Sequence, residues 1–243
     1  MIGIGTIVNC ITVIVGSSIG LLARKGIPTR LQEAMMKVLG IATMFIGISG
    51  TLAEMLVVTE DGLSTQGTML MILSLVIGTV VGELLRVEER LESLGDKLKT
   101  LKLFRHANAT FTEGFVTATL VTSIGAMSII GSFNDGLGLG AELLYTKSIL
   151  DFVSTMIFAS TLGVGVLCSF VPMGLYQGLL TLLARFLQPL FVGTTMISDL
   201  SLVGSVLIFA IGINLFAGKQ IKVGNMLPAL LVPIVYDLVK TIL

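Results

Sequence analysis

Residues 1–25 read MIGIGTIVNCITVIVGSSIGLLARK, an apolar run without a charge until Arg24 and Lys25. About 20 mostly apolar residues are needed for a helix to cross the hydrocarbon of a bilayer. A cleavable signal peptide would carry its basic residues before the apolar stretch, whereas here they follow it. We therefore interpret this run as an uncleaved first membrane span.

The composition of the whole chain extends this interpretation. Of the 243 residues, 54% are hydrophobic and 12% are charged, and the mean hydropathy is +1.00. Soluble domains usually carry about 25% charged residues, so these charges cannot cover a soluble globule of this size. The sequence predicts an all-α, polytopic transmembrane helix bundle that forms a single integral membrane domain over residues 1–243. The net charge of zero gives no indication of nucleic acid binding.

Eight apolar runs are long enough to be spans, at about residues 2–23, 35–58, 67–85, 113–133, 148–169, 172–193, 201–217 and 225–242. Lysine and arginine concentrate in the connections between spans one and two, three and four, and seven and eight. Cytoplasmic connections carry such an excess, which predicts that the N-terminus and the C-terminus both lie outside. The sixth run contains Arg185 and two glutamines, and seven spans remain if it lies flat at the membrane surface.

Residues 86–106, RVEERLESLGDKLKTLKLFRH, connect spans three and four. Their apolar residues recur at intervals of four and three, which places on one helical face Val87, Leu91, Leu94, Leu98 and Leu101. The pattern predicts a cytoplasmic amphipathic helix that lies among lipid headgroups or extends span three. The alternative is a helix that binds a cytoplasmic partner.

Two segments of the chain echo each other, VIVGSSIGLLAR at 13–24 and LVIGTVVGELLR at 75–86. Each has two glycines four residues apart, a spacing that lets membrane helices pack closely. Either an internal duplication of hairpins or generic helix packing explains the echo. The small-residue faces also predict a homo-oligomer.

The segment GSFNDGLGLGAELLYTKSILDF, residues 131–152, carries several charges between two apolar runs. We expect Asn134-Asp135-Gly136 to form the turn that ends span four. Lys147 and Asp151 are four residues apart and share a helical face. Asp151 is expected in the first turn of span five, where the helix dipole favours an anion. The pair is either an ion pair at the outer membrane interface or part of a water-filled path that binds or relays a cation.

Other spans offer polar groups for such a path. In span six, Gln177, Thr181 and Arg185 form a polar stripe, and a buried arginine needs a carboxylate, a carbonyl or water beside it. Asn214 in span seven and Asn9 in span one are available as hydrogen-bond partners. Span four is rich in hydroxyls and glycine, so it tolerates local unwinding where it lines a cavity. The predicted pathway residues are Asn134, Asp135, Lys147, Asp151, Gln177, Arg185 and Asn214.

The sequence does not carry motifs for energy coupling or catalysis. GINLFAGKQ, residues 212–220, has the wrong spacing for a phosphate-binding loop, and no Ser or Thr follows its lysine. The chain has one histidine, and its two cysteines, Cys10 and Cys168, both fall in apolar runs, so neither a metal site nor a disulfide framework is predicted. We predict no catalytic residue and no cofactor.

Four motifs, in this order, resemble the YqgA/YdfK-like family of bacterial membrane proteins: GSFNDGL (131–137), KSILDF (147–152), MIFASTLGVGV (156–166) and VGNMLPALL (223–231). This is a domain-of-unknown-function family whose members are often labelled as transport proteins. The resemblance covers essentially the whole chain, from IGIGTIVN at its start. It implies a bacterial plasma-membrane location and a multi-span helical fold, but it implies neither a substrate nor a catalytic residue.

The leading hypothesis is a membrane channel or an ion-coupled secondary transporter for a small solute or ion, not driven by ATP, with Asp151 as the charge-selecting or coupling group. Lys147 and Arg185 would set its ionisation, because desolvation favours a protonated carboxyl and a nearby cation favours an ionised one. The alternative is a non-transporting scaffold or sensor that binds cytoplasmic partners through the 86–106 helix. The expected partners are the lipid bilayer, the transported solute and further copies of the chain.

Overall fold

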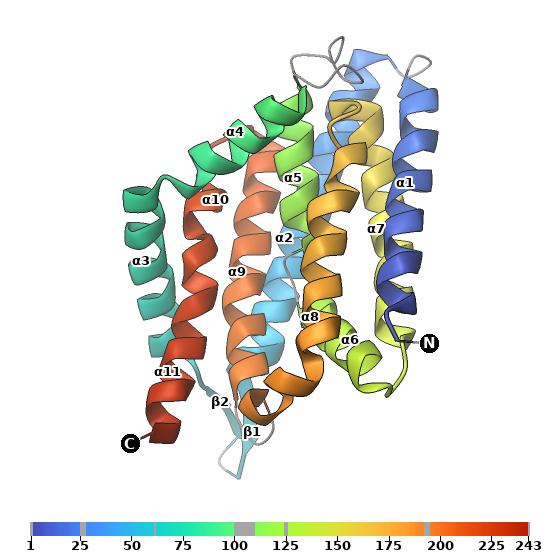
Figure 1. Cartoon of the computed structure of the whole chain (residues 1–243). Coiled ribbons are helices and arrows are strands. Elements are labelled where there is room, and N and C mark those ends of the chain that lie inside the picture. Colours follow the sequence, from blue (N-terminus) through green and yellow to red (C-terminus); the bar gives the residue numbers. More distant parts are fainter. Residues whose placement is uncertain are drawn as a thin grey trace. The chain divides into compact units, whose positions relative to one another are not determined.

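The computed structural model describes residues 2–24, 28–60, 62–99, 110–123, 126–191 and 195–242. This part of the chain is helical apart from one two-stranded hairpin (Figure 1), which confirms the predicted all-α architecture. The helices form two compact units that alternate along the chain. Unit 1 comprises residues 1–37 and 89–188, and unit 2 comprises residues 38–88 and 189–243.

Unit 1 is a helical bundle in which α1 and α7 lie side by side and run in the same direction (Figure 1). Gly16 and Gly20 of α1 sit against the backbone carbonyls of Phe152 and Met156 of α7, where a methyl group would collide with them. Glycine therefore permits this close approach. The elements of the unit are α1 (Ile4–Arg24), α5 (Phe111–Ser123), α6 (Ala126–Leu137), α7 (Glu142–Leu162), the 3-10 turn η1 (Leu167–Ser169) and most of α8 (Phe170–Phe191).

Unit 2 also contains a close helix approach that depends on glycine, because Gly78 and Gly82 of α3 lie against the backbone of Ala229 and Asn225. A short antiparallel hairpin pairs Leu56 with Thr65 and begins directly after α2, so α2 ends at Met55 rather than at residue 58 as expected. The elements are most of α2 (Thr29–Met55), β1 (Leu56–Thr59), β2 (Gly62–Thr65), α3 (Thr68–Leu85), α9 (Met196–Ala217), α10 (Val223–Met226), η2 (Leu227–Leu230) and α11 (Leu231–Ile242).

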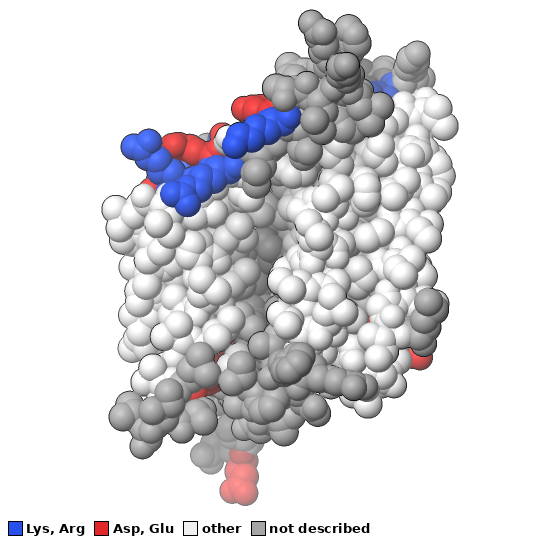
Figure 2. All heavy atoms as spheres, viewed as in Figure 1, with Lys and Arg blue, Asp and Glu red and all other residues white. Residues whose placement is uncertain are grey.

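The connection after α3 forms α4 (Val87–Lys99), which agrees with the amphipathic helix predicted there; residues 100–109 lie outside the described part. Arg86, with φ of 50°, turns the chain, so α4 is a separate helix and not an extension of α3. Glu88 is buried and accepts a hydrogen bond from the Gly224 amide at 3.0 Å. Charged side chains gather along α4, and the helix sides seen on the same face are uncharged (Figure 2).

Five of the described helices are long and apolar enough to cross a membrane, and the pair α5–α6, bent by 59°, makes a sixth if it is one span. The five include Leu167–Ala184, which overlaps the weakly predicted sixth run at residues 172–193. α7 and the α10–α11 segment do not meet the same criterion. A polytopic helical protein is therefore confirmed, and the number of eight spans stays a prediction.

The two glycine pairs of the echo pack against different kinds of partner. Gly16 and Gly20 of α1 lie against α7, which runs in the same direction. Gly78 and Gly82 of α3 lie against η2 and α10, which run in the opposite direction. The choice between internal duplication and generic packing therefore stays open.

Candidate functional site

A hydrogen-bonded polar cluster lies in the interior of unit 1, with the fully buried Asn9 of α1 at its centre. The Asn9 Nδ2 donates to Asp151 Oδ2 at 3.0 Å and to Gln177 Oε1 at 3.2 Å. Lys147 forms an ion pair with the same Asp151 oxygen. Helices α1 and α7 therefore meet at the Asp151 carboxylate, and α8 joins them through Asn9.

The cluster extends to α6 through Ser128. The Gln177 Nε2 donates to the Ser128 Oγ at 3.4 Å, and both residues are fully buried. Ser128 lies in the first turn of α6, next to the bend that separates α5 from α6. Interrupted helices inside membrane proteins are tolerated where they are buried in protein or line a cavity. The polar cluster and the interrupted helix therefore occupy the same region of unit 1.

Lys147 and Asp151 are each only 5% exposed, so their ion pair belongs to the interior of the unit. The expectation that Asp151 lies in the first turn of span five is wrong, because α7 begins at Glu142 and places Asp151 in its third turn. The favourable effect of a helix N-terminus is confined to about the first turn and does not explain this carboxylate. Charges inside membrane helices are costly and are often functional.

The predicted turn at Asn134-Asp135-Gly136 is also wrong, because α6 continues through these residues to Leu137. Gly138, with φ of 75°, ends the helix. The Leu139 amide donates to the Asn134 carbonyl and the Gly138 amide to the Asp135 carbonyl, at 2.8 and 3.1 Å, as in a Schellman motif. The helix therefore ends before Gly138, two residues after the glycine of the predicted turn.

Asp135 is buried but has a structural role in this arrangement. Its two carboxylate oxygens accept hydrogen bonds from the amides of Gly3 and Gly5, at 3.0 and 2.9 Å. These amides lie at the start of α1, where the helix leaves donors without an internal partner and where the dipole favours an anion. Asp135 therefore caps α1 from α6.

Besides Asn134 and Asp135 of α6, two further predicted pathway residues are not placed in the cluster. Asn214 belongs to unit 2, where its Oδ1 accepts from the amides of Gln220 and Ile221, both at 2.9 Å, and so holds the loop after α9. The side chain of Arg185 lies outside the described residues. Ser128 was not predicted, because its contact with α8 follows no local sequence pattern. Asn9 was considered only as an available partner, although it is the central residue.

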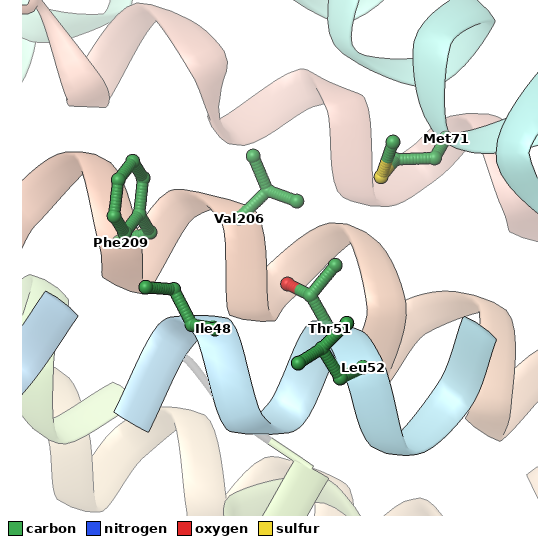
Figure 3. Close-up of a pocket in the computed structure, with 6 residues that line it drawn as sticks. All are labelled: Ile48, Thr51, Leu52, Met71, Val206 and Phe209. Atoms are coloured by element: carbon green, nitrogen blue, oxygen red, sulfur yellow. The ribbon is translucent and has the colours of Figure 1, made fainter. Parts of the chain in front are cut away.

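The position in unit 2 that corresponds to Asn9 is apolar. Asn9 lies seven residues before the first glycine of the pair in α1, and Met71 lies seven residues before the first glycine of the pair in α3. Met71 borders a cavity of about 220 Å³ (Figure 3). The cavity is lined by Ile48, Thr51 and Leu52 of α2, Met71 of α3, and Val206 and Phe209 of α9. In the described residues, the position of α3 that corresponds to Asn9 therefore has no counterpart of the charged cluster of unit 1.

Comparison with known proteins agrees with the motif resemblance. Residues 4–238 match the family described as "Protein of unknown function (DUF554)". The chain is 30% identical over 229 residues to "Uncharacterized membrane protein YdfK" of Bacillus subtilis (strain 168), covering 94% of this chain and 93% of the relative. It is 31% identical over 233 residues to "Uncharacterized protein YqgA" of Escherichia coli (strain K12), with the same two coverages. No solved structure matches. The name of the Bacillus relative and the apolar helices together support a membrane location.

Proposed function

Because the chain belongs to the DUF554 family, which is described as of unknown function, we propose its function from its own residues: a channel or ion-coupled secondary transporter for a small solute or ion. The observation that carries the proposal is the buried Asp151, bound by Lys147 and Asn9 beside an interrupted helix. Ionisable groups inside membrane helices commonly mark ion pathways and proton relays. The pathway would run through unit 1.

Each residue of the cluster has a distinct role in this proposal. Asp151 is the charge-selecting or coupling group, and Lys147 balances its charge while the pathway is empty. Asn9 holds the carboxylate in place, and Gln177 connects Asn9 to Ser128 at the start of α6.

The energetics of the ion pair support a functional role for the cluster. A buried ion pair is often no more stabilising than apolar residues of the same volume, so packing alone does not account for Lys147 and Asp151.

The proposal includes a location and an orientation. We place the protein in the bacterial plasma membrane as a homo-oligomer, with both termini outside and α4 in the cytoplasm. The lysines and arginines of the connection at residues 86–105 favour the cytoplasmic side. The same helix supports a second candidate, a non-transporting scaffold or sensor that binds cytoplasmic partners through α4. The two functions differ in whether water reaches the cluster around Asp151.

Cysteine accessibility in membrane vesicles tests the proposal. In full-length protein with Cys10→Ser and Cys168→Ser, single variants Asp151→Cys and Ser128→Cys would be treated with a small membrane-impermeant thiol reagent from either side. The control is Ser17→Cys, which replaces a fully buried serine of α1. Labelling at 128 and 151 with protection at 17 supports a pathway. Protection at all three, in protein that elutes as one species in detergent, contradicts it and favours the scaffold. The near-isosteric Ser128→Cys keeps the test valid if Asp151→Cys fails to fold.

A further inference from the structure

The cavity of about 220 Å³ in unit 2 has walls from three helices, α2, α3 and α9 (Figure 3). Five of its six lining side chains are hydrophobic. The sixth, Thr51, donates its hydroxyl to the Gly47 carbonyl of its own helix at 2.8 Å. A buried water needs about two to four polar partners, and these side chains do not offer them. The cavity is therefore suited to an apolar ligand.

Packing of α2 and α3 against α9 creates this space. A Cβ on Gly47 of α2 would lie 2.5 Å from the Phe209 amide nitrogen, so the backbones of α2 and α9 are nearly in contact there. Gly67, directly before α3, lies against the Leu202 side chain of α9. Most residues of α9 are buried, but Val206 and Phe209 at the cavity are only half-buried. The neighbouring helices therefore leave part of α9 uncovered at the cavity.

The cavity adjoins a surface that faces lipid in a membrane. All three helices that form its walls are long and apolar enough to span one. Ile48 and Leu52, on its α2 side, are 41% and 47% exposed. Further exposed apolar residues on the same helices include Phe45 of α2 and Ile72 of α3. Exposed apolar surface of this kind marks contact with a membrane, so the cavity is continuous with the lipid contact of the protein.

The depth of the cavity favours a chain that belongs to a phospholipid. Leu52 lies three residues before the end of α2, and Met71 lies three residues after the start of α3. With a helical rise of about 1.5 Å per residue, both lie roughly 5 Å from the helix ends beside the β1–β2 hairpin. This is the part of the hydrocarbon directly below the headgroups. A lipid whose headgroup stays at the membrane surface can therefore place the first part of a chain in the cavity.

We propose that the cavity binds an acyl chain of a phospholipid from the leaflet on the side of the hairpin. The chain fills the space between α2 and α3 and contacts Val206 and Phe209 of α9. Helix association in a bilayer depends on van der Waals contact, because lipid tails are as apolar as the side chains. An unfilled space between helices loses such contacts, and a bound chain supplies them. The inference concerns unit 2 and does not depend on the pathway proposed for unit 1.

Fluorescence quenching in the detergent-solubilised full chain tests the inference. The sequence contains no tryptophan, so Phe209→Trp introduces a single reporter at the cavity. The control is Phe45→Trp, at a position of α2 that is 67% exposed. Each variant would be titrated with phosphatidylcholine brominated near the headgroup end of one chain. We expect the emission of Phe209→Trp to fall and to level off near one lipid per chain, whereas quenching of Phe45→Trp should follow the lipid content of the micelle without levelling off.

A variant that fills the cavity separates a bound chain from general lipid contact. Val206→Phe places a larger side chain in the space that the acyl chain would occupy. It should reduce the quenching of Phe209→Trp severalfold and leave that of Phe45→Trp unchanged. Phosphatidylcholine brominated at the methyl end of the chain should quench Phe209→Trp less than the lipid brominated near the headgroup, because the cavity lies close to the membrane surface.

The inference is overturned if the quenching of Phe209→Trp does not level off, if Val206→Phe leaves it unchanged, or if the methyl-end label quenches more strongly. It is also overturned if a brominated alkane quenches as well as the phospholipid at the same concentration, because the cavity would then bind small apolar molecules instead. If Phe209→Trp does not fold, Met71→Trp on the α3 wall replaces it. Thiol labelling at residue 128 tests the pathway of unit 1 alone, so either proposal can fail without the other.

Discussion

Asn9 and Asp151 meet in the interior of unit 1, with the Asn9 Nδ2 3.0 Å from the Asp151 Oδ2, although 142 positions separate them in the chain. The contact exists because Gly16 and Gly20 bring α1 against the backbone of α7. The carboxylate is therefore held by a helix pair whose approach depends on glycine.

Replacing Asn9 by the isosteric leucine should destabilise the protein. Leucine removes the donor shared by Asp151 and Gln177 and leaves their buried oxygens without it, at an expected cost of about 1–3 kcal/mol. Reversible unfolding in mixed detergent micelles would measure the change. The matched control is Val13→Leu, one turn further along the same helix, which alters volume without removing a polar group. If Asn9→Leu were as stable as the wild type, the hydrogen bonds from Asn9 to Asp151 and Gln177 would contribute little to stability.

The Lys147–Asp151 pair should behave as a unit in a double-mutant cycle. Lys147→Met or Asp151→Leu alone leaves an uncompensated buried charge, with an expected loss of about 3–5 kcal/mol. The double variant should regain most of this stability, because apolar residues of similar volume replace a buried pair well. Additive losses in the unfolding experiment would contradict a coupled pair. Recovery in the double variant would show that the charges are kept for a reason other than stability.

Substitution of Gly82 by alanine should disrupt unit 2. A Cβ at this position would collide with the carbonyl oxygen of Asn225, whereas a Cβ on Gly178 of α8 would meet no atom within 4 Å. Gly82→Ala should therefore lower the Tm. Gly178→Ala should leave it unchanged or raise it, because alanine favours a helix over glycine by about 1 kcal/mol. Equal Tm values for the two variants would show that the close approach of α3 to Asn225 is not required.

Asp135→Ala should loosen the start of α1 without affecting the chemistry of the cluster. The substitution removes the acceptor for the amides of Gly3 and Gly5, and loss of such a cap usually costs about 0.5–2 kcal/mol. Hydrogen exchange should show faster exchange confined to the first turn of α1. Unchanged exchange there would contradict the capping role. Asp135→Asn, which keeps an acceptor oxygen, should retain part of the protection.

The two ends of α3 should face opposite sides of the membrane. Cysteine at Glu92 in α4 should react with an impermeant reagent only from the cytoplasmic side, because the basic residues of this region favour that side. Cysteine at Leu63, which is 75% exposed in the hairpin before α3, should react only from outside. The reverse pattern would invert the proposed orientation, and labelling of both from one side would show that α3 does not span.

Local patterns predicted part of this arrangement. The spacing of Lys147 and Asp151 predicted a pair on one helical face, and the apolar runs predicted the helices. The predicted position of the pair at the start of its helix is wrong. Residues 136–145, GLGLGAELLY, resemble a loop, but their second half forms the start of α7. Asp135 looked like part of a turn because Asn-Asp-Gly is typical of one, but its contact with α1 comes from another helix.

The rest of the cluster could not be predicted from local patterns. The bonds from Asn9 to Asp151 and Gln177 join three helices, and no spacing rule relates residues so far apart in the chain. The same holds for Ser128 and Gln177, which meet only because α6 packs against α8. Helical periodicity identifies the face on which a residue lies and leaves its partner on another helix undetermined.

The most direct test of the central claim is the rate at which an impermeant thiol reagent modifies Ser128→Cys relative to Ser17→Cys, in the background without Cys10 and Cys168. Both serines are fully buried in unit 1, so they differ chiefly in whether they adjoin the cluster around Asp151. A pathway predicts fast modification at 128 and protection at 17. Equal protection at both positions in folded protein would contradict the pathway and leave the cluster without access to water.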